Sequence, residues 1–202
     1  MTRALVFVGA FNPPTNAHIA LAGCALRDTQ RETVLFVPSK SRYIEKDQGK
    51  DFAFMEEERL TMLRKIAKTH PWMRVCDWEL RQSRQPRTYE TLCHLREEGI
   101  DGALLVGSDK LEEMATNWLH VPEIAREFGI VALARGRDVC EEMIAADPLL
   151  SGLAQYIHVV QSPQDWRNTS STGVRQRLRE MQRLLEEVRQ MVPQELDPLE
   201  WL

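Results

Sequence analysis

The stretch LVFVGAFNPPTNAH, from Leu5 to His18, decides the fold of this chain. It begins with the apolar run Leu5 to Val8, breaks at Gly9, and passes two prolines before it reaches Thr15 and His18. A short apolar run that ends at glycine is typical of a buried strand, and proline is common just inside the start of a helix. We therefore predict a strand, a glycine turn and a helix N-terminus in direct succession.

This predicted geometry favours an anion site above the end of the strand. The backbone N–H groups of the turn and the positive end of the helix dipole would point at the same place. Thr15 and His18 are three positions apart, so both would lie on the first helical turn and face that site. A glycine turn before a helix is also common in other α/β proteins, and a lone histidine can be purely structural. The stretch taken alone leaves both interpretations open.

The composition predicts one domain, residues 1–202, that is large enough for a sizeable core. The formal charge is −4, from 26 basic and 30 acidic residues, which argues against a nucleic-acid-binding protein. The opening apolar run is too short for a signal or membrane segment, so we expect no membrane partner. Four scattered cysteines without a C-x-x-C pair argue against a zinc ribbon or a disulfide scaffold and favour the reducing cytoplasm.

Outward from the opening stretch, extended and helical patterns alternate to the end of the chain. Predicted strands follow at 33–37, 73–78, 103–106, 130–134 and 156–160, and predicted helices at 16–29, 52–69, 88–98, 122–128, 138–146 and about 171–192. Such alternation implies a parallel sheet covered on both faces, with right-handed crossovers. The predicted fold class is α/β, a doubly wound parallel sheet.

In such sheets ligands bind beyond the carboxyl ends of the strands. This rule gathers four polar stretches on one rim, namely 9–18, 39–46, 107–109 and 168–175. Neither G-x-G-x-x-G nor G-x-x-x-x-G-K-[ST] occurs, so a hydride-transfer dinucleotide fold and a P-loop are both disfavoured.

Two further motifs lie on that rim. The segment SSTGVR, Ser170 to Arg175, opens the last predicted helix, and either Ser171 or Thr172 is suited to cap it. The segment GSD, Gly107 to Asp109, follows a predicted strand. Each could be an ordinary helix start, so the motifs gain weight only together.

Taken together, the motifs resemble those of one enzyme family. GAFNPPTNAH resembles the nucleotidyltransferase motif GxFxPxTxxH, and SSTGVR resembles the ISSTxxR motif of the same superfamily. The first motif has threonine at Thr15, where many members have a first histidine. This variant of the motif resembles that of the nicotinamide and nicotinate mononucleotide adenylyltransferases. The resemblance extends from Gly9 to Arg175 and implies a Rossmann-like fold of the nucleotidyltransferase type.

The resemblance implies that ATP and a pyridine mononucleotide bind on this rim. Thr15, His18 and Arg175 are then the predicted catalytic residues. The implied ATP site comprises Gly9, Ala10, Phe11, His18, Gly107, Asp109, Ser171, Thr172 and Arg175. The implied pyridine-nucleotide site comprises Lys46, Trp78, Thr88 and Trp118, with Lys40 as the second choice for the lysine that binds phosphate.

The implied reaction transfers AMP from ATP to nicotinamide or nicotinate mononucleotide by direct in-line attack of the acceptor phosphate. Such an enzyme supplies positioning and neutralises charge, so it needs no covalent nucleophile. His18 would contact the α-phosphate, Arg175 the β- and γ-phosphates, and Thr15 would orient a phosphate. We expect Mg²⁺ to be bound mainly by ATP phosphates and water, because the motifs contain no carboxylate cluster.

Two alternatives remain at this stage. The chain could be an adenylyl- or cytidylyltransferase for another small phosphate ester, such as pantetheine phosphate. It could also be a non-catalytic nucleotide sensor, because Thr15 replaces a histidine and Ala17 stands where many members have glycine. The sequence does not choose between the amidated and the acid mononucleotide, and it leaves a homo-oligomer open.

Overall fold

The computed structural model describes residues 1–41, 54–134, 139–162, 166, 168–191, 193 and 199. Six strands form one parallel sheet in the order β3-β2-β1-β4-β5-β6. The strands are β1 (Thr2–Gly9), β2 (Thr33–Pro38), β3 (Met73–Val75), β4 (Ile100–Gly107), β5 (Ile130–Ala134) and β6 (Ile157–Gln161). This strand order is that of the Rossmann-type doubly wound sheet, so the predicted fold class is confirmed.

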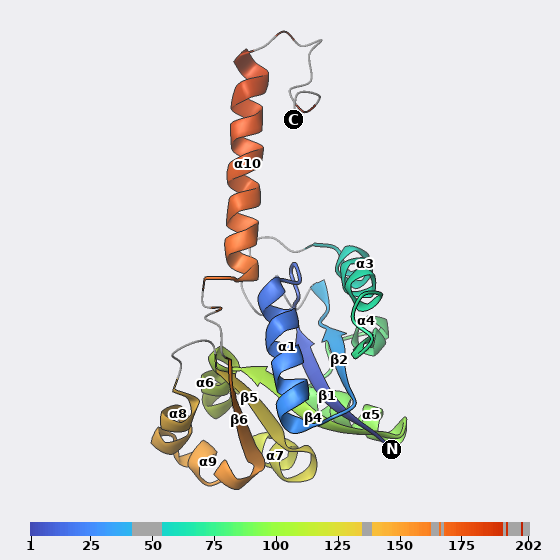
Figure 1. Ribbon diagram of the computed structural model, residues 1–202, viewed down its shortest axis with the longest axis vertical. Coiled ribbons are helices and arrows are strands. Elements are labelled where there is room, and N and C mark those ends of the chain that lie inside the picture. The colour runs from blue at the N-terminus through green and yellow to red at the C-terminus, as the bar shows by residue number, and fades with distance from the viewer. Residues whose placement is uncertain are drawn as a thin grey trace.

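Helices cover both faces of the sheet (Figure 1). They are α1 (Asn16–Thr29), α3 (Glu56–Ala67), α4 (Trp78–Arg81), α5 (Thr88–Glu97), α6 (Ser108–Asn117), α7 (Val121–Phe128), α8 (Cys140–Ala146), α9 (Pro148–Ser151) and α10 (Ser171–Met191), with a 3₁₀ turn at Ala154–Tyr156. The long helix α10 extends away from the sheet, whereas the others lie against it or at its edges (Figure 1).

Strand β1 shows why these elements pack in three layers. Its alternate side chains enter two separate cores, and all four residues from Ala4 to Phe7 are buried. Leu5 and Phe7 pack with α1 and α3, whereas Ala4 and Val6 pack with the helices α5 to α8 on the other face. Burial on both faces explains why the strand reads as a continuous apolar run instead of an alternating one.

The predicted element boundaries differ from the structure in one informative place. Residues 73–78 were expected to form one strand, but β3 ends at Val75 and Trp78 begins the short helix α4. Asp77 accepts hydrogen bonds from Arg81 one turn later and from Arg64 of α3, and the pair with Arg81 forms only across a helical turn. The predicted position of Trp78 at a strand end is therefore wrong.

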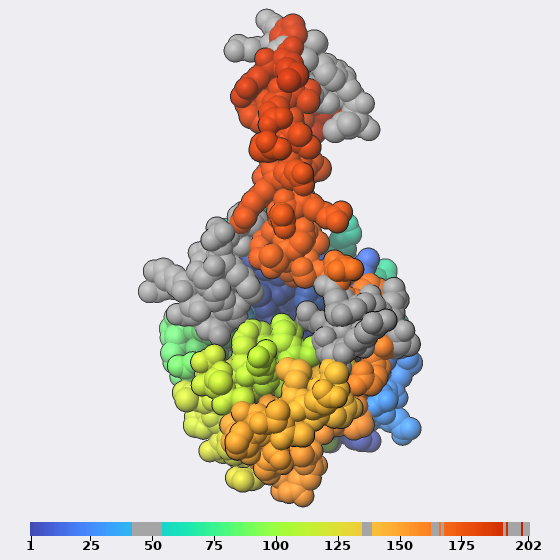
Figure 2. Space-filling view, turned by 90° about the vertical axis from the view of Figure 1, so that its left-hand side faces the viewer, coloured from blue at the N-terminus to red at the C-terminus, as the bar shows by residue number. Residues whose placement is uncertain are grey.

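Helix α10 projects from the body of the molecule as a stalk (Figures 1 and 2). Arg175, in its second turn, is its buried residue. Apolar residues recur along α10 at helical spacing, but among the described residues they are largely exposed, with Met181 60% and Leu184 48% exposed. None of the helices in the described residues combines the length and the apolar character that crossing a membrane requires.

Candidate active site

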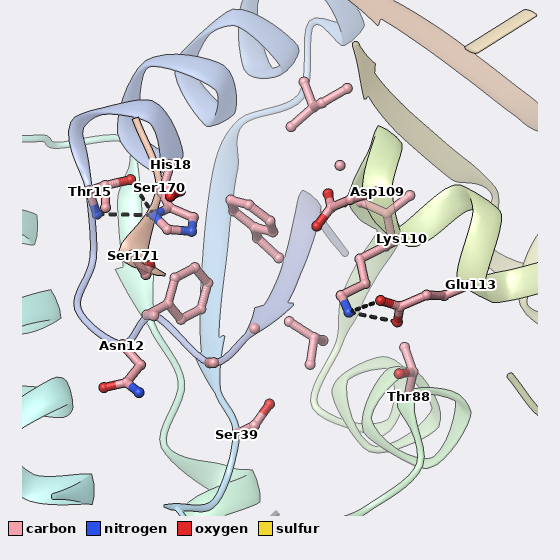
Figure 3. Close-up of a pocket in the computed structure, with 18 of the residues that line it drawn as sticks. Asn12, Thr15, His18, Ser39, Thr88, Asp109, Lys110, Glu113, Ser170 and Ser171 are labelled. Carbon is pink, nitrogen blue, oxygen red and sulfur yellow. Dashed lines mark hydrogen bonds and ion pairs between the residues drawn. The ribbon is translucent and has the colours of Figure 1, made fainter. Parts of the chain in front are cut away.

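A cavity of about 840 Å³ opens at the carboxyl ends of β1 and β4. These adjacent strands flank the point where the strand order reverses, which is the position at which doubly wound sheets bind ligands. One wall is the turn after β1 with the start of α1, and the opposite wall is the start of α6 with Thr88 of α5 (Figure 3). The first turn of α10 also lines the cavity. Its volume is in the range of small-molecule sites.

His18 is fixed to the start of its own helix by Thr15. The Thr15 backbone N–H donates to Nδ1 of His18 over 3.0 Å, and the Thr15 hydroxyl lies 2.8 Å from the same nitrogen (Figure 3). An N–H group can only donate, so Nδ1 is an acceptor and the ring proton is assigned to Nε2. In the structure Thr15 thus orients His18, and the predicted role of Thr15 in orienting a phosphate stays a prediction.

Aromatic packing explains the glycine in the first motif. Phe11 is buried with a left-handed φ of 44°, and its ring packs edge-on against both Phe7 and His18. A Cβ on Gly9 would lie 3.2 Å from the Phe11 ring, which is closer than ordinary contact. The turn thus keeps glycine because the aromatic ring folds back over it.

Ala17, which was left unexplained by the sequence, is 4% exposed. It packs in the apolar core between α1 and the sheet and also borders the cavity. A methyl group therefore fits at this position.

Arg59 of α3 stabilises the turn after β1, a role that the sequence did not indicate. Its guanidinium is fully buried and donates to the backbone oxygens of Ala10 at 2.7 Å, Ser39 at 2.6 Å and Phe54 at 3.2 Å. The three acceptors come from three separate loops. The motif "EER" within an ordinary helical pattern gives no signal of this role, because an arginine there is typical of a solvated face.

Arg175 ties the start of α10 to the same turn. Its Nη1 donates to the backbone oxygen of Asn12 at 2.7 Å, and its Nη2 donates to the Thr172 hydroxyl at 3.1 Å. The Ser171 hydroxyl donates to the Pro13 backbone oxygen at 2.8 Å. The turn after β1 and the start of α10, more than 150 residues apart in sequence, are thereby joined into one clamp.

The cap of α10 differs from the prediction. The sequence suggested Ser171 or Thr172, but Ser170 accepts the Gly173 backbone N–H on its hydroxyl at 3.1 Å. Ser170 also lines the cavity. The shift by one residue leaves the Ser171 and Thr172 side chains to contact Pro13 and Arg175.

The opposite wall of the cavity holds further polar groups. Asp109 and Lys110 project from the first turn of α6, and Glu113 follows one turn later (Figure 3). Trp118, at the C-terminal end of α6, is half-buried against the core and borders the cavity. Lys110, Glu113 and Ser39 of the lining were not singled out from the sequence; a lysine directly after Asp109 was the available signal for the first.

A buried carboxyl group supports the loop that leads to Thr88. Glu79 is fully buried and accepts hydrogen bonds from Thr91 at 2.6 Å and from the side chain of Gln85 at 2.5 Å. Burial raises the pKa of Glu79 to about 7, although both hydrogen bonds act to lower it. Gln85 itself lines the cavity and accepts the Lys40 backbone N–H. Sequence reasoning missed Glu79 because it adjoins the more conspicuous Trp78.

The structure brings most of the predicted site residues to this one cavity. The lining includes Gly9, Ala10, Phe11, Thr15, His18, Thr88, Gly107, Asp109, Trp118, Ser171, Thr172 and Arg175. Trp78 is not among the lining residues; its indole stacks on His94 with ring centroids 4.3 Å apart. Lys46 lies outside the described residues. Lys40, the second choice, donates to the Leu80 backbone oxygen at 2.6 Å and is also outside the lining.

Comparisons with known proteins agree with this geometry. The chain is 27% identical over 161 residues to a probable nicotinate-nucleotide adenylyltransferase of Caldicellulosiruptor bescii, covering 80% of each chain. It is 31% identical over 172 residues to a nicotinamide/nicotinic acid mononucleotide adenylyltransferase of Arabidopsis thaliana, covering 77% of this chain and 71% of the relative.

A solved structure shares the fold. A nicotinic acid mononucleotide adenylyltransferase of Plasmodium falciparum, in complex with NaAD, superimposes with a TM-score of 0.61 at 17% identity, covering 81% of this chain and 77% of that chain. The cytidylyltransferase-like family model matches residues 6–177, which include every motif of the cavity. The chain therefore belongs to the cytidylyltransferase-like family and, within it, to the nicotinamide and nicotinate mononucleotide adenylyltransferases.

Proposed function

We propose that this chain transfers AMP from ATP to nicotinamide or nicotinate mononucleotide, forming the dinucleotide and pyrophosphate. The single observation that supports this most is the clamp at the cavity. The turn after β1, the start of α6 and the first turn of α10 all open onto one space of about 840 Å³. These are the three segments that the family resemblance assigns to ATP.

The chemistry needs no group from the protein to form a covalent bond. An oxygen of the acceptor phosphate attacks the α-phosphorus of ATP, the new P–O bond forms, and the bond to the β-phosphate oxygen breaks. Pyrophosphate leaves with that electron pair. The protein supplies alignment and stabilises the charge that develops on the α-phosphate oxygens and on the leaving group.

His18 is suited to the α-phosphate because its proton is on Nε2. A hydrogen bond from this N–H to a non-bridging oxygen strengthens as negative charge grows there. Thr15 keeps the ring in this tautomer through its contacts with Nδ1. In this proposal Arg175 and the first turn of α10 bind the β- and γ-phosphates, where the helix N-terminus adds favourable partial charge.

In this proposal Mg²⁺ enters with ATP as its phosphate complex. The described part of the chain has no group of three or more histidine, cysteine or acidic side chains that could hold a metal ion. Phosphate and water oxygens are ligands that Mg²⁺ accepts readily, so the nucleotide itself can hold the ion.

The substitution His18→Ala tests the proposal. We expect kcat for pyrophosphate release, with ATP and either mononucleotide, to fall on the order of a hundredfold, as it does when one charge-stabilising donor is lost. His158→Ala is the matched control, because His158 is an exposed histidine that pairs with Asp28 away from the cavity. A His18→Ala enzyme within a few-fold of the wild-type kcat would exclude the role of His18. Absence of turnover by the wild type would exclude the reaction.

We also propose that the reaction takes place in the cytoplasm. None of the four cysteines, Cys24, Cys76, Cys93 and Cys140, forms a disulfide bond in the structure, which suits a reducing compartment. A homo-oligomer stays a prediction, and sedimentation velocity of the purified chain would test it.

A further inference from the structure

Lys110 and Glu113 form an ion pair on the wall of the cavity. The Lys110 ammonium lies 2.7 Å and 2.6 Å from the two carboxylate oxygens of Glu113. Both side chains project from α6 into the cavity, on the same wall as Asp109 and Thr88 and across from His18 (Figure 3). The pair therefore borders the space between the implied ATP residues and the implied acceptor residues.

The pair is loosely held, because both side chains are partly exposed, 35% for Lys110 and 46% for Glu113. Exposed pairs with a spacing of three residues contribute little to stability. An anion that enters the cavity can therefore displace the carboxylate at little cost. A lysine ammonium is a mobile point charge on a flexible chain, so it can turn to a new partner without moving the helix.

Two other cations of the lining, Arg175 and Arg84, are held by partners of a different kind. Arg175 is buried and donates to Asn12 and Thr172. Arg84 donates to both carboxylate oxygens of Glu90, a residue outside the lining. Lys110 differs from these two arginines because its acidic partner also lies in the cavity, so a bound ligand meets both members of the pair.

We propose that Lys110 binds an anionic group of the acceptor nucleotide and that Glu113 is the counter-ion it leaves when the acceptor enters. This inference rests on the proposed function for the identity of the acceptor. The anionic group is either the acceptor phosphate or the ring carboxylate that distinguishes the acid mononucleotide from the amide. Glu113 stays in the cavity and repels the same anion, so the two residues set acceptor affinity in opposite directions.

Two variants separate this role from general damage to the site. Lys110→Met keeps the length of the side chain and removes its charge. Glu113→Gln keeps the shape and releases the lysine. We expect Lys110→Met to raise the acceptor Kd about tenfold and Glu113→Gln to lower it a few-fold. A merely structural pair would move both variants in the same direction. Arg183→Met is the matched control, since it breaks the exposed Arg183–Glu187 pair of α10, which is outside the cavity.

The Kd is measured by isothermal titration calorimetry of the whole chain with nicotinate mononucleotide and, separately, with nicotinamide mononucleotide. The KM of each acceptor is measured alongside. Weaker binding of both acceptors by Lys110→Met assigns the lysine to the phosphate. Weaker binding of the acid alone assigns it to the carboxylate. Unchanged Kd for both acceptors in Lys110→Met, or a shift of the same sign in both variants, would overturn the inference.

The same titrations keep the two proposals apart. Wild-type protein that binds an acceptor, responds to the two substitutions as expected and yet releases no pyrophosphate would refute the proposed function and leave the subsite standing. Normal turnover with an unchanged acceptor Kd in Lys110→Met would refute the subsite and leave the function standing. Wild-type protein that binds neither acceptor would overturn both.

Discussion

Glu79 shows how one residue can support the site without touching it. Its carboxyl group is fully buried, and its partners Thr91 and Gln85 do not titrate. Gln85 links it to the cavity wall and to the backbone of Lys40, so Glu79 fixes the loop before Thr88. The cost of this arrangement is the desolvation that raises the pKa of Glu79 to about 7.

The raised pKa predicts how stability depends on pH. In the unfolded chain Glu79 titrates near its ordinary pKa of 4.5, so between pH 4.5 and about 7 the folded protein holds a proton that the unfolded chain has lost. The stabilisation is complete below pH 4.5 and is lost as the pH rises through about 7. Across this window the unfolding free energy of the wild type should therefore decrease by at most about 3 kcal/mol. We expect Glu79→Gln to abolish this decrease, because glutamine does not titrate. Urea unfolding of both proteins from pH 4.5 to 8 measures this, and parallel profiles would contradict it.

At the residue scale, the sequence predicts which motif residues line the cavity, but it does not predict the residues that hold the surrounding loops in place. His18, Asp109 and Arg175 lie at fixed offsets within short motifs, and all three reach the cavity. Arg59 and Glu79 act through loops that lie up to 49 residues away in the chain, so no local pattern marks them. Trp78 illustrates the reverse error, because an aromatic residue near the predicted acceptor side stacks on His94 instead.

At the scale of elements, strands and helices followed from apolar spacing wherever a whole face is buried. Strand β5 and helix α1, both buried against the sheet, match their predicted spans, whereas β3 is shorter than predicted. The segment from Met73 to Trp78 alternates like a strand, but ion pairs of Asp77 turn its end into a helix. Such side-chain contacts between elements are not visible in periodicity.

Helices α7 and α10 make a contrast that can be tested. Ile124 of α7 is fully buried, whereas Met181 and Leu184 of α10 are 60% and 48% exposed. We expect Ile124→Ala to lower the unfolding free energy by about 2–5 kcal/mol, because it opens a cavity in the core. The double substitution Met181→Gln with Leu184→Gln should change it by no more than about 0.5 kcal/mol, because surface changes of similar helix propensity have small effects. Urea unfolding measures both, and a loss above 1 kcal/mol in α10 would mean that its apolar face is covered in solution.

At the scale of the molecule, the cavity is where the two halves of the doubly wound sheet meet. Its walls come from β1 with α1, from β4 with α6, and from the two chain segments that open α5 and α10. The sequence predicted that these segments lie together, because the carboxyl ends of parallel strands share one edge of the sheet. It could not predict that α10 would leave the body after its first turns, because the same apolar spacing also describes a helix packed on the sheet.

A ligand that contacts both halves should therefore stabilise the whole fold. The size of this stabilisation distinguishes the proposed acceptor from other phosphate esters. The dinucleotide product, at a hundred times its Kd, adds about 2.7 kcal/mol to the unfolding free energy. For a chain of this size that corresponds to a rise in Tm of about 5–10 °C. Pantetheine phosphate at the same concentration should leave Tm unchanged, because it lacks the pyridine ring that we predict Trp118, half-buried at the cavity border, to contact. Thermal unfolding with each ligand checks this. Stabilisation by pantetheine phosphate without stabilisation by the dinucleotide would point to a different acceptor in the same cavity.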